Sequence, residues 1–366
     1  MRSALVLASI FLGPAIAHAD DTELNRATVI YARGSVLYKS DGKGKGEVEL
    51  AKLPASSVVR ALRTDAGGTV LLADLAIPGK QSKWAWLPLD GAAKSLVELP
   101  CSDGPAQLAV DGACVLCRGA TATTSLIVNL KTGKATPVAI PAPGARLAGA
   151  GKDRKLVWAD KTGVWSSPPG NPNHKTKLAA EAPLRSFLPS PDGARAVGVY
   201  SDFIYEGRQQ KPAEMLMGFA LDGQAARRKG LRDGVPLEWS HDNQYVLIQN
   251  GSSACMMRAI GGQYKCWKGF IATSIAPDGS YALVFGNRNA TRTAQPASKK
   301  SPAKQQGENV PDDPTSVSAP AGDDVPMAPP TGPLALYRAK LDGPFDAAPQ
   351  LVVQNIDGAA VWVPGR

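Results

Sequence analysis

Short apolar runs recur along the whole chain and are separated by turns rich in aspartate and glycine. Typical runs are residues 69–73, 196–200, 245–249 and 281–285. They are rich in β-branched and aromatic residues, and no segment that follows the N-terminal region keeps a helical period over a helix-sized window. The pattern therefore predicts an all-β protein made of short antiparallel strands.

One class of turn recurs at an interval typical of repeat proteins. Its aspartates are separated by 46, 42, 39, 50 and 36 residues, at Asp65, Asp111, Asp153, Asp192, Asp242 and Asp278. A second set of glycine turns, which includes residues 221–223 and 341–343, recurs out of phase with the first. Asp and Gly tolerate the backbone angles of tight hairpin turns. Each unit therefore reads as four strands joined by hairpins.

Units of four antiparallel strands that repeat at this interval are typical of β-propeller blades. Six whole units fit residues 57–100, 101–140, 141–181, 182–232, 233–270 and 271–355. Residues 359–363 read as a lone first strand, and residues 28–31, 35–39 and 48–53 as the other three. The fold prediction is a single propeller of seven four-stranded blades, closed by both termini, which removes open sheet edges. Six or eight blades, and a pair of β-sandwiches, remain open.

The N-terminal segment has the pattern of a cleavable export signal. Arg2 precedes an apolar run over residues 4–16, and Ala17, His18 and Ala19 form a small-x-small cleavage site. We therefore predict a signal peptide over residues 1–19 and a propeller domain over residues 20–366.

One segment, residues 287–333, breaks the repeat. It contains nine prolines, few apolar residues and no periodicity. It cannot bury enough surface to offset the entropy of ordering, so we predict a disordered Pro-rich insertion in a loop of the sixth blade.

The charge balance is moderately basic, with 41 Lys and Arg against 32 Asp and Glu and a formal net charge of +9. The basic residues are scattered, apart from residues 227–229 and Lys299–Lys300, and no aromatic residues are interleaved with them. This distribution argues against a nucleic-acid partner. No later run has the length of a membrane span. We expect a monomeric protein that is exported, periplasmic or secreted, with another envelope or secreted protein as its partner.

All five cysteines lie in the part that would be exported, where disulfides persist. Cys255 and Cys266 flank a Gly-Gly turn almost symmetrically, so we predict that they are bonded. Cys101–Cys117 is the better second bridge, because Cys114 and Cys117 would point to opposite faces of one strand. The spacing offers no zinc site, and we predict neither a metal nor a cofactor.

Four arginines fall on the first strand of successive units, which lines the central channel of a propeller: Arg60, Arg63, Arg146 and Arg185. Converging at the channel mouth, they would bind a carboxylate or phosphate group. In the alternative interpretation, each pairs with a neighbouring acid or with water.

Three segments, residues 190–197, 239–246 and 276–283, resemble the W-S-P-D-G-x-x-hydrophobic core of TolB-type WD-like propeller repeats. The resemblance covers residues 184–286 and 334–355, while residues 65–67 and 110–112 retain only the turn. It implies an exported propeller that serves as a periplasmic protein-binding scaffold. The additional N-terminal α/β domain of TolB is not expected here, and no Gly-x-Ser-x-Gly nucleophile motif is present.

The leading hypothesis is a non-catalytic exported scaffold that binds a protein or envelope component through the face with long loops. The loop over residues 201–213, between the second and third strands of the fourth unit, is the main candidate. The alternative is a lyase or hydrolase that acts on an anionic polysaccharide in the channel, with Arg63 or Arg185 stabilising charge. A third possibility is a structural module without a ligand of its own.

Overall fold

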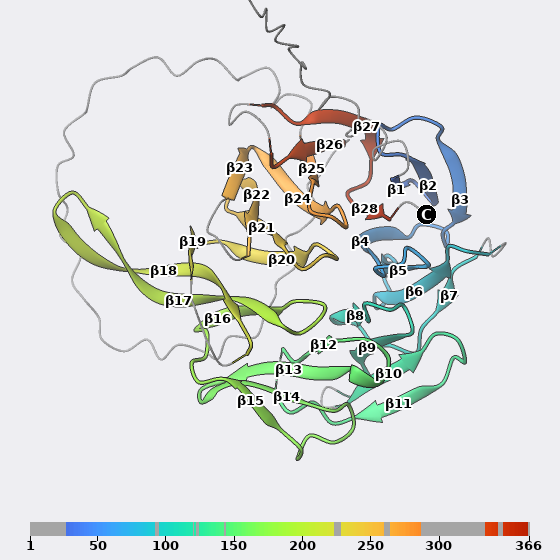
Figure 1. The fold of residues 1–366 in the computed structure, drawn as a ribbon. Coiled ribbons are helices and arrows are strands. Elements are labelled where there is room, and N and C mark those ends of the chain that lie inside the picture. The colour runs from blue at the N-terminus through green and yellow to red at the C-terminus, as the bar shows by residue number, and fades with distance from the viewer. Residues whose placement is uncertain are drawn as a thin grey trace, which may run out of the picture.

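Seven four-stranded antiparallel sheets follow one another around a ring (Figure 1). The computed structural model describes residues 27–91, 95–119, 121, 124–142, 144–222, 228–259, 264–286, 334–342 and 347–364. The signal peptide predicted over residues 1–19 and the insertion predicted over residues 287–333 lie outside these residues.

The blades are numbered here from the first complete unit of the sequence. The first contains β4 (Val58–Thr64), β5 (Val70–Ala76), β6 (Lys83–Pro88) and β7 (Val97–Glu98), and the second contains β8 (Ala106–Leu108), β9 (Cys114–Arg118), β10 (Ser125–Asn129) and β11 (Ala135–Val138). The third contains β12 (Arg146–Ala148), the short 3₁₀ helix η2 (Gly151–Asp153), β13 (Lys155–Asp160), β14 (Gly163–Ser167) and β15 (Thr176–Ala179). The fourth contains β16 (Arg185–Pro189), β17 (Arg195–Glu206), β18 (Gln209–Ala220) and β19 (Arg228–Arg232).

The remaining blades complete the ring. The fifth contains β20 (Val235–Trp239), β21 (Tyr245–Asn250), β22 (Ser253–Arg258) and β23 (Tyr264–Lys268), and the sixth contains β24 (Phe270–Ile275), β25 (Tyr281–Gly286), β26 (Leu334–Lys340) and β27 (Gln350–Ile356). The seventh contains β28 (Ala360–Val363), β1 (Thr28–Arg33), β2 (Val36–Asp41) and β3 (Val48–Lys52).

The seventh blade joins the two ends of the chain, as the sequence predicts. Strand β28 pairs antiparallel with β1, in a register that places Val361 opposite Ile30 and Val363 opposite Thr28. Seven blades and closure by both termini are therefore confirmed, and the six-blade, eight-blade and sandwich alternatives are wrong.

The core lies between adjacent blades. Successive side chains of a strand point to opposite faces, so each inner strand serves two neighbours. In β1, Ile30 packs in a cluster with Leu71 and Leu87 of the first blade. The next residue, Tyr31, packs in a cluster with Leu336 of the sixth blade. Burial between blades explains why each sheet needs both of its neighbours.

Hydrogen bonds also cross every seam of the ring. Going around from the first blade, they join Ala66 N to Val110 O (2.9 Å), Leu147 N to Gln107 Oε1 (2.7 Å), Gly149 N to Pro191 O (2.7 Å), Trp239 Nε1 to Leu188 O (3.2 Å), Ile275 N to Glu238 Oε2 (3.0 Å), Thr273 Oγ1 to Ala360 O (3.0 Å) and Thr64 Oγ1 to Trp362 O (3.0 Å). Polar groups of the inner strands are thus satisfied by the next blade.

The recurring Asp-Gly turns have a shared hydrogen-bonding reason. In the fourth blade, the Ser190 hydroxyl donates to Asp192 Oδ1, which also accepts the backbone N–H of Ala194 at 2.9 Å. The fifth blade repeats the arrangement with Ser240 and Asp242. A carboxylate at this position accepts hydrogen bonds from backbone N–H groups of its own turn. The spacing of these aspartates along the sequence therefore indicates the positions of the blades.

Both predicted disulfides are present. Cys255 on β22 lies directly opposite Cys266 on β23, with their Cα atoms 4.1 Å apart. Cys101 is bonded to Cys117 on β9, with Cα atoms 5.8 Å apart. The fifth cysteine, Cys114, is buried and free.

The fourth blade differs from the sequence expectation. The long loop predicted over residues 201–213 is wrong, because β17 and β18 continue as a paired ladder as far as Glu206 and Gln209. The run over residues 203–205 is aromatic and β-branched, which favours a strand, and the ladder continues to a tight turn. We call residues 201–214 the ribbon. It projects away from the ring in Figure 1.

Candidate functional site

Two of the four predicted arginines form ion pairs with acids of their own blade. Arg60 on β4 donates Nε and Nη2 to the carboxylate of Asp74 on β5, each at 3.0 Å, and Nη2 reaches Asp103 at 3.4 Å. Asp74 is buried, which raises its pKa, and the Arg60 guanidinium partly offsets this shift. Arg60 therefore ties the first blade to the segment that leads into the second.

Arg185 on β16 donates Nη2 to Glu214 on β18 at 2.5 Å, and both side chains are 44% exposed. Arg146 lies half-buried on β12. Arg60 and Arg185 each form an ion pair with a nearby acid, as the alternative interpretation of the sequence expects. Their charges are therefore partly neutralised at the channel mouth.

Arg63 has a different environment. It is exposed on β4, and its charge acts on Glu238 of β20, four blades further along the chain. Glu238 accepts the backbone N–H of Ile275 at 3.0 Å and hydrogen-bonds the side chain of Ser274. Desolvation nevertheless raises the pKa of Glu238 to about 7, while Arg63 and these hydrogen bonds oppose the rise. Glu238 is thus an acid that titrates near neutral pH on an inner strand.

His241 follows Glu238 in the turn after β20. Burial lowers the pKa of its imidazole, and the carboxylates of Asp65 and Asp242 oppose the shift. Its Nδ1 atom is buried and has no hydrogen-bond partner among the described residues.

The ribbon places aromatic side chains in solvent. Phe203 is 51% exposed and Tyr205 is 70% exposed. They lie two residues apart on β17, so both side chains project from one face, where Pro212 is the cross-strand neighbour of Phe203. The opposite face is anchored, because Ile204 and Ala213 pack against the core cluster between the third and fourth blades.

The base of the ribbon borders a hollow of about 320 Å³, lined by Ser201, Pro212, Ala213, Glu214, Arg232 and Asp233. Beyond this point the ribbon has no neighbouring strand within the described ranges. Strand β16 pairs with β17 only as far as Val199, and β19 pairs with β18 only as far as Met215. Both edges of the ribbon therefore present unpaired backbone groups.

Sequence reasoning missed the ribbon face and gave no role to Glu238. The aromatic and β-branched run over residues 203–205 was an available signal for a strand. No local signal in the sequence indicates the pKa of Glu238, because this pKa depends on residues of other blades.

Among the described residues, no three His, Cys, Asp or Glu side chains gather to hold a metal ion, and no helix there has the length and hydropathy needed to cross a membrane.

Comparison with known proteins gives similarity of structure only. No family model matches the sequence, and no curated protein matches it. The structure is similar to TolB from Acinetobacter baumannii, with 12% identity and a TM-score of 0.44, over 64% of this chain and 62% of that one. The chain therefore matches less than two thirds of that TolB protein.

Two enzymes are also among the similar structures. Hydrazine synthase from Kuenenia stuttgartiensis has 12% identity and a TM-score of 0.41, over 62% of this chain and 73% of that one. The dihydro-heme d1 dehydrogenase NirN has 13% identity and a TM-score of 0.45, over 92% of this chain and 75% of that one. The chain is a seven-bladed β-propeller, and a TolB protein is one of the solved structures that it resembles.

Proposed function

We propose that this chain is a non-catalytic, exported scaffold that binds another envelope or secreted protein through the ribbon. The observation that carries the proposal is the exposure of Phe203 and Tyr205 on a projecting element. Aromatic residues dominate the energetics of protein interfaces. Full burial of a phenylalanine side chain contributes about 1.5–3 kcal/mol, and roughly half of the Phe203 surface is still available for it.

The backbone of the ribbon supports the same proposal. An extended partner segment adds to an exposed strand edge through main-chain hydrogen bonds, and alternate side chains then provide specificity. The unpaired edge of β18 over Gln209–Glu214 is long enough for several such bonds. The hollow at its base would receive a side chain of that partner strand.

Export is part of the proposal. Two disulfides are typical of a protein in an oxidising compartment, such as the periplasm or the extracellular space. The predicted signal peptide over residues 1–19 supports the same location.

Site-specific photo-crosslinking in the intact envelope tests the ribbon. A photoreactive phenylalanine at position 203 or 205 should give one discrete protein adduct. The matched control is position 264, because Tyr264 on β23 is 48% exposed but lies on the outer strand of another blade. The adduct from position 203 should disappear when Tyr205→Ser and Pro212→Ser are added. Equal adducts from positions 203 and 264 would refute a docking role for the ribbon.

A second function is favoured by Glu238. An acid with a pKa of about 7 that faces an arginine charge suits general acid-base chemistry at neutral pH. In this alternative, the chain is a lyase or hydrolase of an anionic polysaccharide, with Arg63 binding the anionic group and Glu238 transferring a proton. Turnover of any anionic glycan should be abolished by Glu238→Gln but kept by Tyr205→Ser. If a broad screen of anionic glycans shows no turnover, this alternative is wrong.

A further inference from the structure

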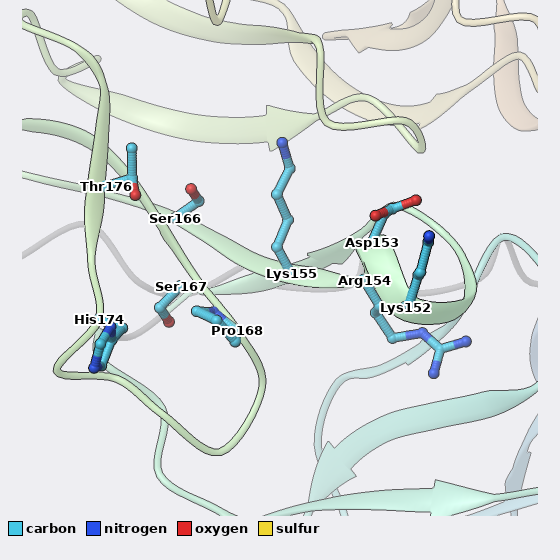
Figure 2. A pocket seen from close by; sticks show the side chains of 9 residues that line it. All are labelled: Lys152, Asp153, Arg154, Lys155, Ser166, Ser167, Pro168, His174 and Thr176. Carbon is cyan, nitrogen blue, oxygen red and sulfur yellow. The ribbon is translucent and has the colours of Figure 1, made fainter.

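We propose that the third blade binds an oxyanion of the phosphate type in a hollow at the end of its sheet. The hollow has a volume of about 200 Å³, and its lining includes Lys152, Asp153, Arg154, Lys155, Ser167 and His174 (Figure 2). This volume accommodates a tetrahedral anion with a few water molecules. We call it the basic hollow.

The topology of the blade builds the basic hollow from two connections. The turn between β12 and β13 supplies Lys152 and Arg154, and the connection between β14 and β15 supplies His174. In an antiparallel sheet these two connections lie at the same end, while the connection between the second and third strands lies at the other end. The basic hollow and the ribbon are therefore on opposite faces of the propeller, so this site is independent of the proposed protein docking.

Positive charge is concentrated in this blade. Residues 146–179 contain seven Lys and Arg but two Asp, a net charge of +5 within a chain of net charge +9. Three basic side chains and one acid, Asp153, line the hollow itself. One of the three, Arg154, is already paired with Asp111 of the second blade at 2.6 Å. Lys155 donates to the carbonyl of Gly193 of the fourth blade at 3.2 Å, and the charge of the exposed Lys152 attracts an anion.

Two lining residues also have buried polar atoms that lack a hydrogen-bond partner among the described residues. They are the hydroxyl oxygen of Ser167, whose residue is only 2% exposed, and the Nε of Arg154. A buried polar group without a partner is destabilising, so its persistence points to a ligand or water that satisfies it. A hydroxyl and a guanidinium N–H both donate to phosphate oxygens.

The lining therefore combines what oxyanion recognition needs. Lys152 supplies charge, Arg154 and His174 supply N–H donors, and Ser167 supplies a buried hydroxyl. Lys155 points to the other face of the sheet from Ser167, towards the fourth blade (Figure 2). The same chemistry is offered by a free phosphate ion and by a phosphate ester on a larger molecule. The two sources differ in whether the mouth of the hollow admits the group that carries the ester.

Titration of the full chain with inorganic phosphate at constant ionic strength tests the proposal. Binding, followed by calorimetry and by the rise in the thermal midpoint, should saturate at one site per chain. Ser167→Ala should weaken it about tenfold, as expected for loss of a hydrogen bond to a charged group. Without phosphate, this variant should be no less stable than the original protein, because the hydroxyl has no partner to lose.

Lys152→Gln and Lys80→Gln form the matched pair of charge variants. Both lysines are exposed, but Lys80 lies in the first blade. Only Lys152→Gln should weaken phosphate binding. Glucose 1-phosphate that binds at least as tightly as inorganic phosphate would identify an ester as the ligand, and its exclusion would identify the free ion. A stabilisation that does not saturate, or that falls equally in both lysine variants, would overturn the proposal.

Discussion

Replacing Glu238 with glutamine should remove a pH-dependent loss of stability. Glu238 lies on β20, where its Oε2 accepts the backbone N–H of Ile275 across the seam between the fifth and sixth blades. Glutamine keeps an acceptor oxygen at this position and removes only the ionisable proton. The variant therefore separates the charge of the side chain from its role at the seam.

The expected size follows from the pKa of Glu238, which rises from 4.5 to about 7 on folding, mainly by desolvation. Each pKa unit corresponds to about 1.4 kcal/mol, so ionised Glu238 costs about 3 kcal/mol in the folded state. Because the pKa of Glu238 is higher in the folded state, its contribution to the free energy of unfolding is fully present below the unfolded pKa of 4.5. It is lost as the pH rises towards and through 7.

His241 acts in the opposite direction in the same turn. Burial lowers its pKa, so its contribution is lost as the pH falls through 6.5 and below. Because His241 is present in both proteins, its effect cancels in the difference between them.

Urea unfolding at several pH values measures that difference. The free energy of unfolding of Glu238→Gln, relative to the original protein, should rise by about 3 kcal/mol between about pH 4 and about pH 8. A difference that stays constant over this range would refute the claim that Glu238 is desolvated in the folded protein.

Three further substitutions test the packing of the ring by urea unfolding. Trp362→Ala, at a residue only 2% exposed in the closing strand, should cost about 3–5 kcal/mol; a loss below about 1 kcal/mol would contradict closure by β28. Gly218→Ala would place a Cβ 1.8 Å from the carbonyl oxygen of Ala259 and should cost at least about 1–3 kcal/mol, with unchanged stability arguing against this close contact of blades. Asp65→Ala removes the acceptor of the backbone N–H groups of Thr69 and Val70, both at 2.7 Å, and should cost about 3 kcal/mol.

The architecture could be predicted from the sequence because each blade contains turn motifs that depend only on nearby residues. In the Ser190–Asp192 and Ser240–Asp242 turns, the hydrogen bonds join residues no more than five positions apart. These turns therefore form without contacts to distant parts of the chain, and their spacing in the sequence marks the blades. Closure was predictable for a related reason. The lone strand predicted over residues 359–363 and the three strands predicted at the other terminus each form only part of a blade. Together they make one complete four-stranded sheet.

Side-chain chemistry was less predictable because it depends on register between strands. Arg60 and Arg185 do lie on inner strands, as expected, but their partners Asp74 and Glu214 are 14 and 29 residues away on other strands. The raised pKa of Glu238 likewise depends on the neighbouring sixth blade. The ribbon differs for another reason: residues 201–206 have no period of two, and only the short apolar run over residues 203–205, between polar residues, indicated a strand.

The two proposed sites occupy adjacent blades but opposite faces, and the contacts between those blades determine whether they influence each other. Lys155 of the basic hollow donates to the carbonyl of Gly193 at 3.2 Å, and Gly149 donates to Pro191 at 2.7 Å. Both contacts end in the turn before β17, whereas the ribbon begins at the far end of that strand. A rigid, hydrogen-bonded strand offers no second arrangement for an anion to select, and coupling requires a differential affinity for two states. Saturating phosphate should therefore leave the yield of the position 203 adduct unchanged, and a change in that yield would show that the fourth blade has two conformations.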